Sequence, residues 1–365
     1  MLHDRLSRLV DQVIDQGLDA LAVVPGPNLF YLTGLSFHLS ERPIVALFPV
    51  DRLPAIVLPV LEAAKLERAA VELEAFPYTD EEGHVPAFQS ACASLELAEC
   101  IVGVEALHMR LLEMWLLERY APGCRLVPAE DVLAELRLCK EEHEVSLMRR
   151  AIAVTQAALG ATMRQVGAGT TEQQVAALLT GELLRAGGEA IAFPPIVVAG
   201  PNAASCHATP TDRPIQPGET IVVDCGVTVG GYAADITRTF AIGPLGPELA
   251  RVYEVVREAN AAGRAAAGPG VPAEEVDRAA RAVIERAGHG EHFIHRTGHG
   301  LGLEVHEPPY IVAGNRRPLE PGMVFTVEPG IYLPGQGGVR IEDDVLVTAS
   351  GAESLTTSPR ECGVL

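Results

Sequence analysis

The chain has 365 residues, of which 48% are hydrophobic and 21% charged, the composition of a globular protein with room for two domains. Its 48 acidic and 28 basic side chains give a net charge of −20, which disfavours nucleic acid and anionic membrane surfaces as partners. The seven scattered cysteines include no C-x-x-C pair, and the sequence offers neither a signal peptide nor an apolar run long enough for a membrane span, so we expect a cytoplasmic protein with reduced thiols.

Residues 1–138 are predicted to form a small α/β domain, because helix-like and strand-like patterns alternate along them. Leu6, Leu9 and Val13 fall on one face of an opening helix. The segment Pro25–Pro43 is interpreted as a loop whose surface polar residues include His38. Apolar runs predict four strands and a second helix, at Leu21–Val24, Ile44–Phe48, Ala55–Leu58, Ile101–Val104 and Leu107–Leu117 respectively.

A second domain is predicted over residues 139–365, entered by a charged helix that begins near Lys140. It contains an internal repeat, because Gly169–Gly187 can be aligned with Gly270–Gly288 at a constant offset of 101 residues. In both copies we expect a helix that is opened by Thr171 or Pro272 and closed by glycine. A domain of two similar halves tends to place a site on the pseudo-two-fold axis between them; chance similarity of two helices is the alternative.

Two acidic residues lie on either side of a predicted hairpin turn. The dipeptide Gly230-Gly231 separates two strand-like runs, and a turn at that place sets Asp235 opposite Gly226. Asp224 then lies two residues along on the same face, roughly 7–8 Å from Asp235 at most between Cβ atoms. Two buried carboxylates so close would repel each other unless protonated or neutralised, which favours a metal site. Two aspartates that face solvent are the alternative.

Later segments supply more potential metal ligands. The block TGHGLGLEVHEPP contains His299 and His306, MVFTVEPG places Glu328 at the end of an apolar run, and VRIEDDVLV places Glu342 in another. Together with the two aspartates, Glu328 and Glu342 carry four negative charges, which two divalent ions would balance. Carboxylates and one imidazole without thiolate suit manganese, cobalt or zinc.

These blocks carry a family resemblance. D-x-G followed by DITRT, TGHGLGLEVHEPP, VEPG and RIED resemble the metallopeptidase family that contains Xaa-Pro dipeptidases (prolidases), Xaa-Pro aminopeptidases and methionine aminopeptidases. The likeness covers about Lys140 to the C-terminus, and NLFYLTG near the start is similar to the opening domain of the proline-directed members. The resemblance implies a creatinase-like α/β N-terminal domain, then an α+β pita-bread domain with pseudo-two-fold halves, in a homodimer.

The same resemblance implies a role for each site residue. The five ligands of a dinuclear centre with two divalent ions (Mn, Co or Zn) would be Asp224, Asp235, His299, Glu328 and Glu342. Glu328 would also be the general base, His306 would contact the substrate or the developing oxyanion, and His207 would be a second catalytic histidine on the substrate side. Tyr232 and Phe193 are candidates for the proline pocket, with packing as their alternative role.

The implied substrates are short Xaa-Pro peptides, and a dipeptidase should bind their free carboxylate with a cation. Some prolidases carry an arginine four residues after the VHE histidine, where this chain has Tyr310. Arg296, Arg340 or Arg42 from a second copy could replace it. The short N-terminal domain and the compact chain resemble small prolidases, and this resemblance favours a dipeptidase over an aminopeptidase. A metal-free creatinase-type amidinohydrolase and a non-catalytic peptide-binding module are disfavoured, because all five ligand positions are present.

Overall fold

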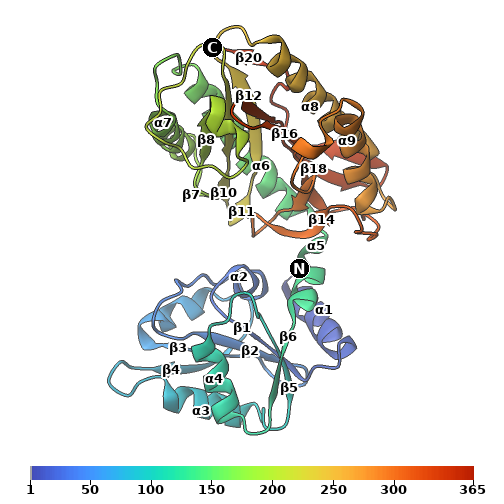
Figure 1. Cartoon of the computed structure of the whole chain (residues 1–365). Helices are drawn as coiled ribbons and strands as arrows, with labels where there is room; N and C mark the ends of the chain where they lie inside the picture. The colour runs from blue at the N-terminus through green and yellow to red at the C-terminus, as the bar shows by residue number, and fades with distance from the viewer. Residues whose placement is uncertain (1) are drawn as a thin grey trace. The chain divides into compact units, whose positions relative to one another are not determined.

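The computed structural model describes residues 2–365 and divides the chain into two compact units, one ending at Arg137 and the other spanning Leu138–Leu365 (Figure 1). Each unit has a hydrophobic core of its own. No helix in the described part of the chain is long and apolar enough to cross a membrane.

The first unit is built on a mixed six-stranded sheet with strand order β4-β3-β2-β1-β5-β6. Strands β1 and β5 pair in parallel, whereas β1 and β2 pair antiparallel. The predicted strands recur within one residue of their expected ends, because each is an apolar run that the core buries. The elements are α1 (Leu2–Asp15), β1 (Ala20–Val23), α2 (Pro27–Thr33), β2 (Val45–Pro49), β3 (Ala55–Pro59), the 3₁₀ segment η1 (Val60–Arg68), β4 (Glu74–Tyr78), α3 (Val85–Ser94), β5 (Ile101–Val104), α4 (Leu111–Tyr120), β6 (Arg125–Pro128) and α5 (Glu130–Leu138).

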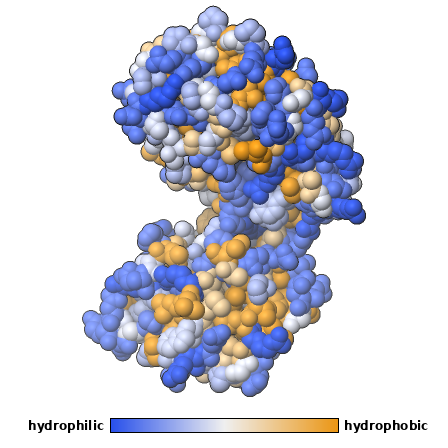
Figure 2. All heavy atoms as spheres, viewed as in Figure 1, coloured by the Kyte–Doolittle hydropathy of each residue, from blue (hydrophilic) through white to orange (hydrophobic). Residues whose placement is uncertain are grey.

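Two predictions for this unit were wrong in detail. The segment interpreted as a loop contains helix α2, which begins at Pro27 and ends where Gly34 takes a left-handed φ of 73° and donates its N–H to the Phe30 carbonyl. The helix expected from Leu107 begins at Leu111 instead, because the preceding residues form a turn in which the Glu105 carbonyl accepts two backbone N–H groups. Figure 2 shows apolar patches on the face of this unit that it presents, and Leu107 is 81% exposed.

The predicted repeat in the second unit is confirmed. Helix α7 (Glu172–Arg185) and helix α9 (Ala273–Arg286) have the same length and the expected offset. Thr171 caps α7 with its side chain, Pro272 precedes α9, and a glycine with positive φ follows each helix. Each of them packs against a long helix that precedes it, α6 (Glu142–Met163) or α8 (Pro247–Ala266). In Figure 1, α7 lies on one side of the strands and α8 with α9 on the other.

Two antiparallel sheets lie between these helices. The first has the order β20-β12-β9-β8, in which the C-terminal strand β20 pairs in parallel with β12, and the second has the order β14-β13-β15-β18-β19. Two smaller sheets, β11-β10-β7 and β16-β17, complete the unit. The elements are β7 (Ala190–Ile191), β8 (Ile196–Ala199), η2 (Gly200–Ala204), β9 (Thr220–Cys225), β10 (Val227–Val229), β11 (Tyr232–Ala233), β12 (Ile236–Ala241), η3 (Gly290–His292), β13 (Gly298–Gly300), β14 (Glu307–Ile311), β15 (Val324–Val327), β16 (Gly330–Leu333), β17 (Gly337–Arg340), β18 (Asp343–Thr348), β19 (Gly351–Ser354) and β20 (Gly363–Val364).

Candidate metal centre

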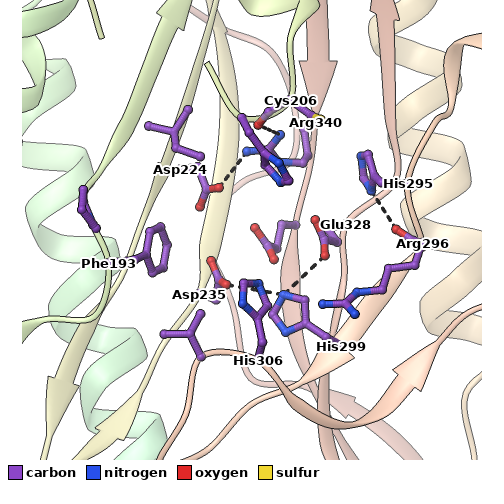
Figure 3. Close-up of a pocket in the computed structure, with 15 residues that line it drawn as sticks. Phe193, Cys206, Asp224, Asp235, His295, Arg296, His299, His306, Glu328 and Arg340 are labelled. Atoms are coloured by element: carbon purple, nitrogen blue, oxygen red, sulfur yellow. Dashed lines mark hydrogen bonds and ion pairs between the residues drawn. The ribbon is translucent and has the colours of Figure 1, made fainter. Parts of the chain in front are cut away.

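A cavity of about 570 Å³ opens among the strands of the second unit (Figure 3). Every residue of this chain that was predicted to take part in the site lines the cavity except Tyr232; Arg42, the candidate from a second copy, does not line it either. Its walls are formed by Phe193, Pro194, Ile196, Cys206, His207, Asp224, Asp235, His295, Arg296, His299, Val305, His306, Glu328, Arg340 and Glu342. The cavity therefore draws on strands of both halves of the repeat.

The hairpin prediction is confirmed in its register. Gly230 and Gly231 form the turn with φ values of 58° and 83°, which a residue with a side chain rarely adopts. Strand β9 pairs with β12 so that Asp224 lies opposite Thr237, and Ala234 donates its N–H to the Val227 carbonyl. Asp224 and Asp235 consequently face the same cavity (Figure 3).

His299 lies on β13, which packs closely against the neighbouring strand β15. A Cβ atom on Gly298 would lie 1.8 Å from the Thr326 carbonyl oxygen, so the absence of a side chain at this position lets β13 approach its neighbouring strand. The His299 backbone donates to Thr326 Oγ1, and its Nδ1 lies 3.1 Å from the Gly300 carbonyl oxygen. Because that oxygen can only accept, Nδ1 carries the hydrogen, and Nε2 keeps its lone pair toward the cavity.

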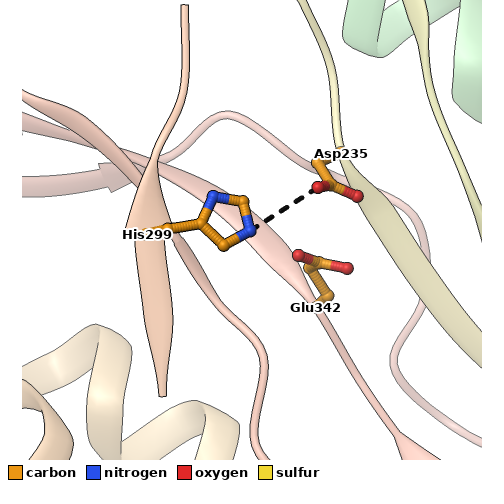
Figure 4. A group of neighbouring side chains, drawn as sticks. All are labelled: Asp235, His299 and Glu342. Carbon is orange, nitrogen blue, oxygen red and sulfur yellow. Dashed lines mark ion pairs between the residues drawn. The ribbon is translucent and has the colours of Figure 1, made fainter. Parts of the chain in front are cut away.

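Three of the five predicted ligands form a compact group. Ligand atoms of Asp235, His299 and Glu342 all lie within 4.8 Å of one another (Figure 4). His299 Nε2 is 3.7 Å from Asp235 Oδ2 and 3.4 Å from Glu328 Oε1. Glu342 is fixed by the Thr237 hydroxyl, which donates to Oε2 at 2.6 Å. Asp224 and Glu328 line the same cavity outside this group.

Two carboxylate oxygens at the cavity lack a hydrogen-bond partner, although both are buried. They are Asp224 Oδ1 and Asp235 Oδ1. Buried carboxylate oxygens are nearly always satisfied, and a cation is the partner that an acceptor-only group requires when no donor is near. The donor set therefore fits a divalent metal ion.

The pKa values of the cavity's ionisable groups, in the polypeptide without metal, also favour a cation site. Burial raises the pKa of Asp235 and of Glu342 well above the usual carboxyl range, and the neighbouring carboxylates raise both further. Burial also raises the pKa of Glu328 to about 7. Burial lowers the pKa of His299 to about 3, so its imidazole is neutral and able to act as a ligand. Cations among these groups would reverse the penalty on the charged carboxylates.

Arg340 is part of the site's framework. Its Nη2 donates to Asp224 Oδ2 at 2.7 Å, its Nη1 to the Tyr332 hydroxyl and the Cys206 carbonyl, and its Nε to Thr237 Oγ1. Arg340 is 3% exposed, so these donors are directed into the protein. Arg340 therefore orients a predicted metal ligand, which the sequence could not indicate because the two are far apart along the chain.

The two predicted catalytic histidines line the cavity with exposed side chains. The rings of His306 and His299 meet edge to face with centroids 4.2 Å apart. Burial of part of the ring, followed by the charge of Arg296, lowers the pKa of His306. His207 lies on the same cavity wall and is exposed.

Tyr232 does not occupy the place that the sequence suggested. It is 5% exposed, and its hydroxyl donates to Glu144 on α6, so the structure gives it a packing contact outside the cavity wall. The reason is the hairpin register, which turns Tyr232 toward the helix and Asp235 toward the cavity. Phe193 lines the cavity instead.

Sequence reasoning missed one supporting residue next to the site. His295 Nε2 lies 2.9 Å from the Tyr332 hydroxyl, and burial lowers the pKa of this histidine to about 4. Its position directly before the RTGHG segment was the available signal. The pair extends the hydrogen-bonded framework of Arg340, because Tyr332 also accepts from that arginine.

Comparison with known proteins agrees with this architecture. Residues 146–349 match the model of metallopeptidase family M24, and residues 5–139 match the creatinase/prolidase N-terminal domain. The chain is 40% identical to the probable dipeptidase PepE of Mycobacterium tuberculosis over 98% of its own length and 95% of that protein. Among solved structures it is similar to dipeptidase PepE from Mycobacterium ulcerans, with a TM-score of 0.92, 40% identity and coverage of 100% and 97% of the two chains.

A second solved structure, that of a prolidase, is similar over the whole chain. The chain is similar to a recombinant prolidase from Thermococcus sibiricus, with a TM-score of 0.95, 34% identity and coverage of 100% and 99% of the two chains. The prediction of a creatinase-like domain followed by a pita-bread domain is thereby confirmed. With its peptidase domain matched over more than half of the sequence and a relative at 40% identity, the chain belongs to metallopeptidase family M24.

Proposed function

We propose that this chain is a metal-dependent dipeptidase that hydrolyses Xaa-Pro dipeptides. The chain is similar over nearly its whole length to proteins that are named dipeptidase or prolidase. The observation that carries the proposal is the convergence of four carboxylates and one imidazole on a single cavity, two of whose buried oxygens lack a partner. Cations inside the cavity would let these buried carboxylates stay ionised, which their burial otherwise opposes.

Two divalent ions would be held by Asp224, Asp235, His299, Glu328 and Glu342. Arg340 offsets one of the four negative charges and fixes Asp224. When bound, the ions would supply Lewis acidity toward the scissile carbonyl and a water that is acidic near neutral pH. The oxygen-rich donor set suits Mn, Co or Zn.

Glu328 is the proposed general base. Its carboxylate lines the cavity, with Oε1 3.4 Å from His299 Nε2, where it could take a proton from a water in the cavity. Thr326 Oγ1 lies 3.4 Å from Glu328 Oε1 and steadies the side chain. The proton that Glu328 takes from the attacking water can pass to the proline nitrogen as the bond breaks.

His306 and His207 are the proposed contacts to the reacting carbonyl and the substrate. The lowered pKa of His306 keeps its ring neutral at neutral pH, so that it offers one N–H donor to a developing oxyanion. Phe193 and Ile196 supply apolar wall for a proline ring. The proline nitrogen of an Xaa-Pro bond is a tertiary amide nitrogen and has no N–H to donate. An apolar pocket for the ring is therefore the available means of selecting proline.

The test uses metal removal and a pair of substrates. Dialysis against a chelator should abolish hydrolysis of Ala-Pro, and Mn, Co or Zn should restore it. Ala-Pro should be cleaved at least tenfold faster, by kcat/KM, than Ala-Pro-Ala. Comparable cleavage of the tripeptide would identify an aminopeptidase, and full activity of a sample shown to be metal-free would exclude the metallopeptidase mechanism.

The homodimer and the cytoplasmic location stay predictions. Sedimentation velocity of the full chain should give a mass near twice 38.7 kDa if the first is right. Fractionation of cells that produce the protein tests the second.

A further inference from the structure

We propose that the second unit has a binding site for a phosphate group, separate from the metal-centre cavity, and that this site is coupled to the segments that carry Glu328 and Glu342. The site is a cavity of about 290 Å³ lined by residues of helix α8 and of the segment 359–361. It shares no lining residue with the metal-centre cavity. The inference goes beyond the proposed peptidase activity and does not depend on it.

Three arginines meet one buried carboxylate next to this cavity. Asp343 is fully buried, and its Oδ1 accepts from Arg238 Nη2 at 2.8 Å. Its Oδ2 accepts from Arg360 Nε at 2.6 Å and lies 3.3 Å from Arg264 Nε. One negative charge therefore faces three positive charges, an excess of two. A phosphate group, with a charge of about −1.5 to −2 near pH 7, would balance that excess.

Arg264 has hydrogen-bond donors directed to the cavity that no protein group uses. Its Nε donates to Asn260 Oδ1 at 2.8 Å, whereas neither Nη atom has a hydrogen-bond partner within the described part of the chain. The side chain is 24% exposed and lines the cavity. Burial lowers the pKa of Arg264; Asp343 opposes this shift, and the charges of the two neighbouring arginines add to it. An anion in the cavity would offset both the burial and the repulsion between the arginines.

The acidic residues of the cavity wall act on a different arginine. Arg257 donates to Glu254 from Nε and Nη2 at 2.9 and 2.5 Å. This hydrogen bond is the main cause of the raised pKa of Arg257, and the charges of Glu361 and Glu258 contribute after it. Both wall residues, Glu258 and Glu361, are exposed. The end of the cavity at Arg264 therefore stays suited to an anion.

The size and charge of the cavity favour a phosphate group over a carboxylate. A volume of about 290 Å³ corresponds to roughly ten water molecules, so inorganic phosphate and a small phosphate ester both fit. Guanidinium groups bind phosphate oxygens through paired N–H donors. A carboxylate carries a single charge and would leave part of the positive excess unbalanced.

Asn260 connects this site to the metal centre. It is fully buried, and its Oδ1 accepts from Arg264 while its Nδ2 donates to the carbonyls of Val327 and Ile341 at 2.9 and 3.2 Å. Each of these two residues directly precedes a predicted metal ligand in the chain. An anion that fixes Arg264 should also hold Asn260 in place, and with it the backbone that carries the two ligands.

The binding test titrates the full chain, freed of metal on a chelating resin, with inorganic phosphate and with glycerol 3-phosphate in a calorimeter. We expect saturable binding of one phosphate group per chain, and we expect Arg264→Gln to weaken it roughly 10- to 100-fold. The probe that binds more tightly identifies the source of the group. Absence of saturable binding of both probes, or the same heat from sodium chloride at equal ionic strength, would overturn the proposal.

A second pair of variants leaves the arginines in place. Ala261 is exposed on α8 and lines the cavity, so Ala261→Glu introduces a negative charge there, and Ala261→Gln adds a side chain of the same shape without the charge. The glutamate should abolish phosphate binding, and the glutamine should weaken it much less. Arg278→Gln is the surface control, because Arg278 is 64% exposed and lies outside the cavity wall. Equal loss in both Ala261 variants, or loss in the control, would show that the arginine cluster does not bind the anion.

Amide hydrogen exchange tests the coupling. Phosphate should increase the protection of β15 and of the segment that joins β17 to β18 in the wild type, and it should leave Ala261→Glu unchanged. Unchanged protection in the wild type at saturating phosphate would refute the coupling. Neither measurement uses peptide hydrolysis, so failure of the proposed activity would not affect the result.

Discussion

Replacement of Glu328 by glutamine should stabilise the metal-free protein at pH 8 while it weakens metal binding. The pKa of this carboxyl is raised from 4.5 to about 7 by burial in a cavity that it shares with three other acids. An amide of the same shape keeps an oxygen for Thr326 Oγ1 and carries no charge. Ionisation of the buried Glu328 carboxyl costs free energy in the folded state, and the neutral amide avoids this cost.

The sign and size of the change in unfolding free energy follow from the number of protons bound by the folded and unfolded states. Between the unfolded pKa near 4.5 and the folded pKa near 7, the folded state holds a proton that the unfolded state has lost, so the stability of the wild type falls as pH rises through this window. At about 1.4 kcal/mol per unit, the full shift corresponds to about 3 kcal/mol. That amount equals roughly 6–12 °C in melting temperature for a unit of this size.

The assay is thermal unfolding in chelator at pH 5 and pH 8, followed by circular dichroism. Trp115, the single tryptophan, lies in the other unit, so its fluorescence serves as an internal reference. Glu353→Gln is the matched control, because Arg149 lowers the pKa of that exposed carboxyl and its loss should be slightly destabilising. If Glu328→Gln melts no higher than the wild type at pH 8, or shows the same gain at pH 5, the electrostatic account of the cavity is wrong.

Three further predictions concern packing and catalysis. Gly298→Ala should destabilise the protein by roughly 2 kcal/mol or more and weaken metal binding, since the new Cβ would meet the Thr326 carbonyl at 1.8 Å; melting temperature and metal titration measure this. Lys140→Met should destabilise by about 3–5 kcal/mol because it leaves Glu307 buried without its cation, and the double variant with Glu307→Leu should recover most of the loss in urea unfolding. His306→Ala should lower kcat for Ala-Pro by roughly 10²- to 10³-fold with little change in KM, and a kcat unaffected by the change would remove His306 from the proposed chemistry.

Much of the architecture could be predicted because it depends on local signals. The hairpin register followed from the Gly230-Gly231 dipeptide, since a two-residue turn leaves one way to pair the strands that flank it. The helices of the repeat followed from Thr171 and Pro272, which mark helix starts. Helix α2 was missed because its opening Pro27 and closing Gly34 also have the composition of a loop.

The parts that could not be predicted depend on contacts between distant segments. Arg340 donates to Asp224 from more than a hundred residues away, and no pattern in either segment indicates this pairing. Tyr232 is adjacent to the site in sequence yet turns toward Glu144, because alternation along the strand sends neighbours to opposite faces. Sequence identifies which residue types are present, whereas tertiary packing decides which of them share a cavity.

The candidate ligands are divided between the two halves of the repeat. Asp224 and Asp235 belong to the β9–β12 hairpin, whereas His299, Glu328 and Glu342 belong to the sheet that follows α9. Ions bound by all five would join the halves as a non-covalent cross-link that neither half could form alone. A fragment ending before α9 would lack three of these side chains. High-affinity cation binding would therefore indicate that both halves have folded and packed together.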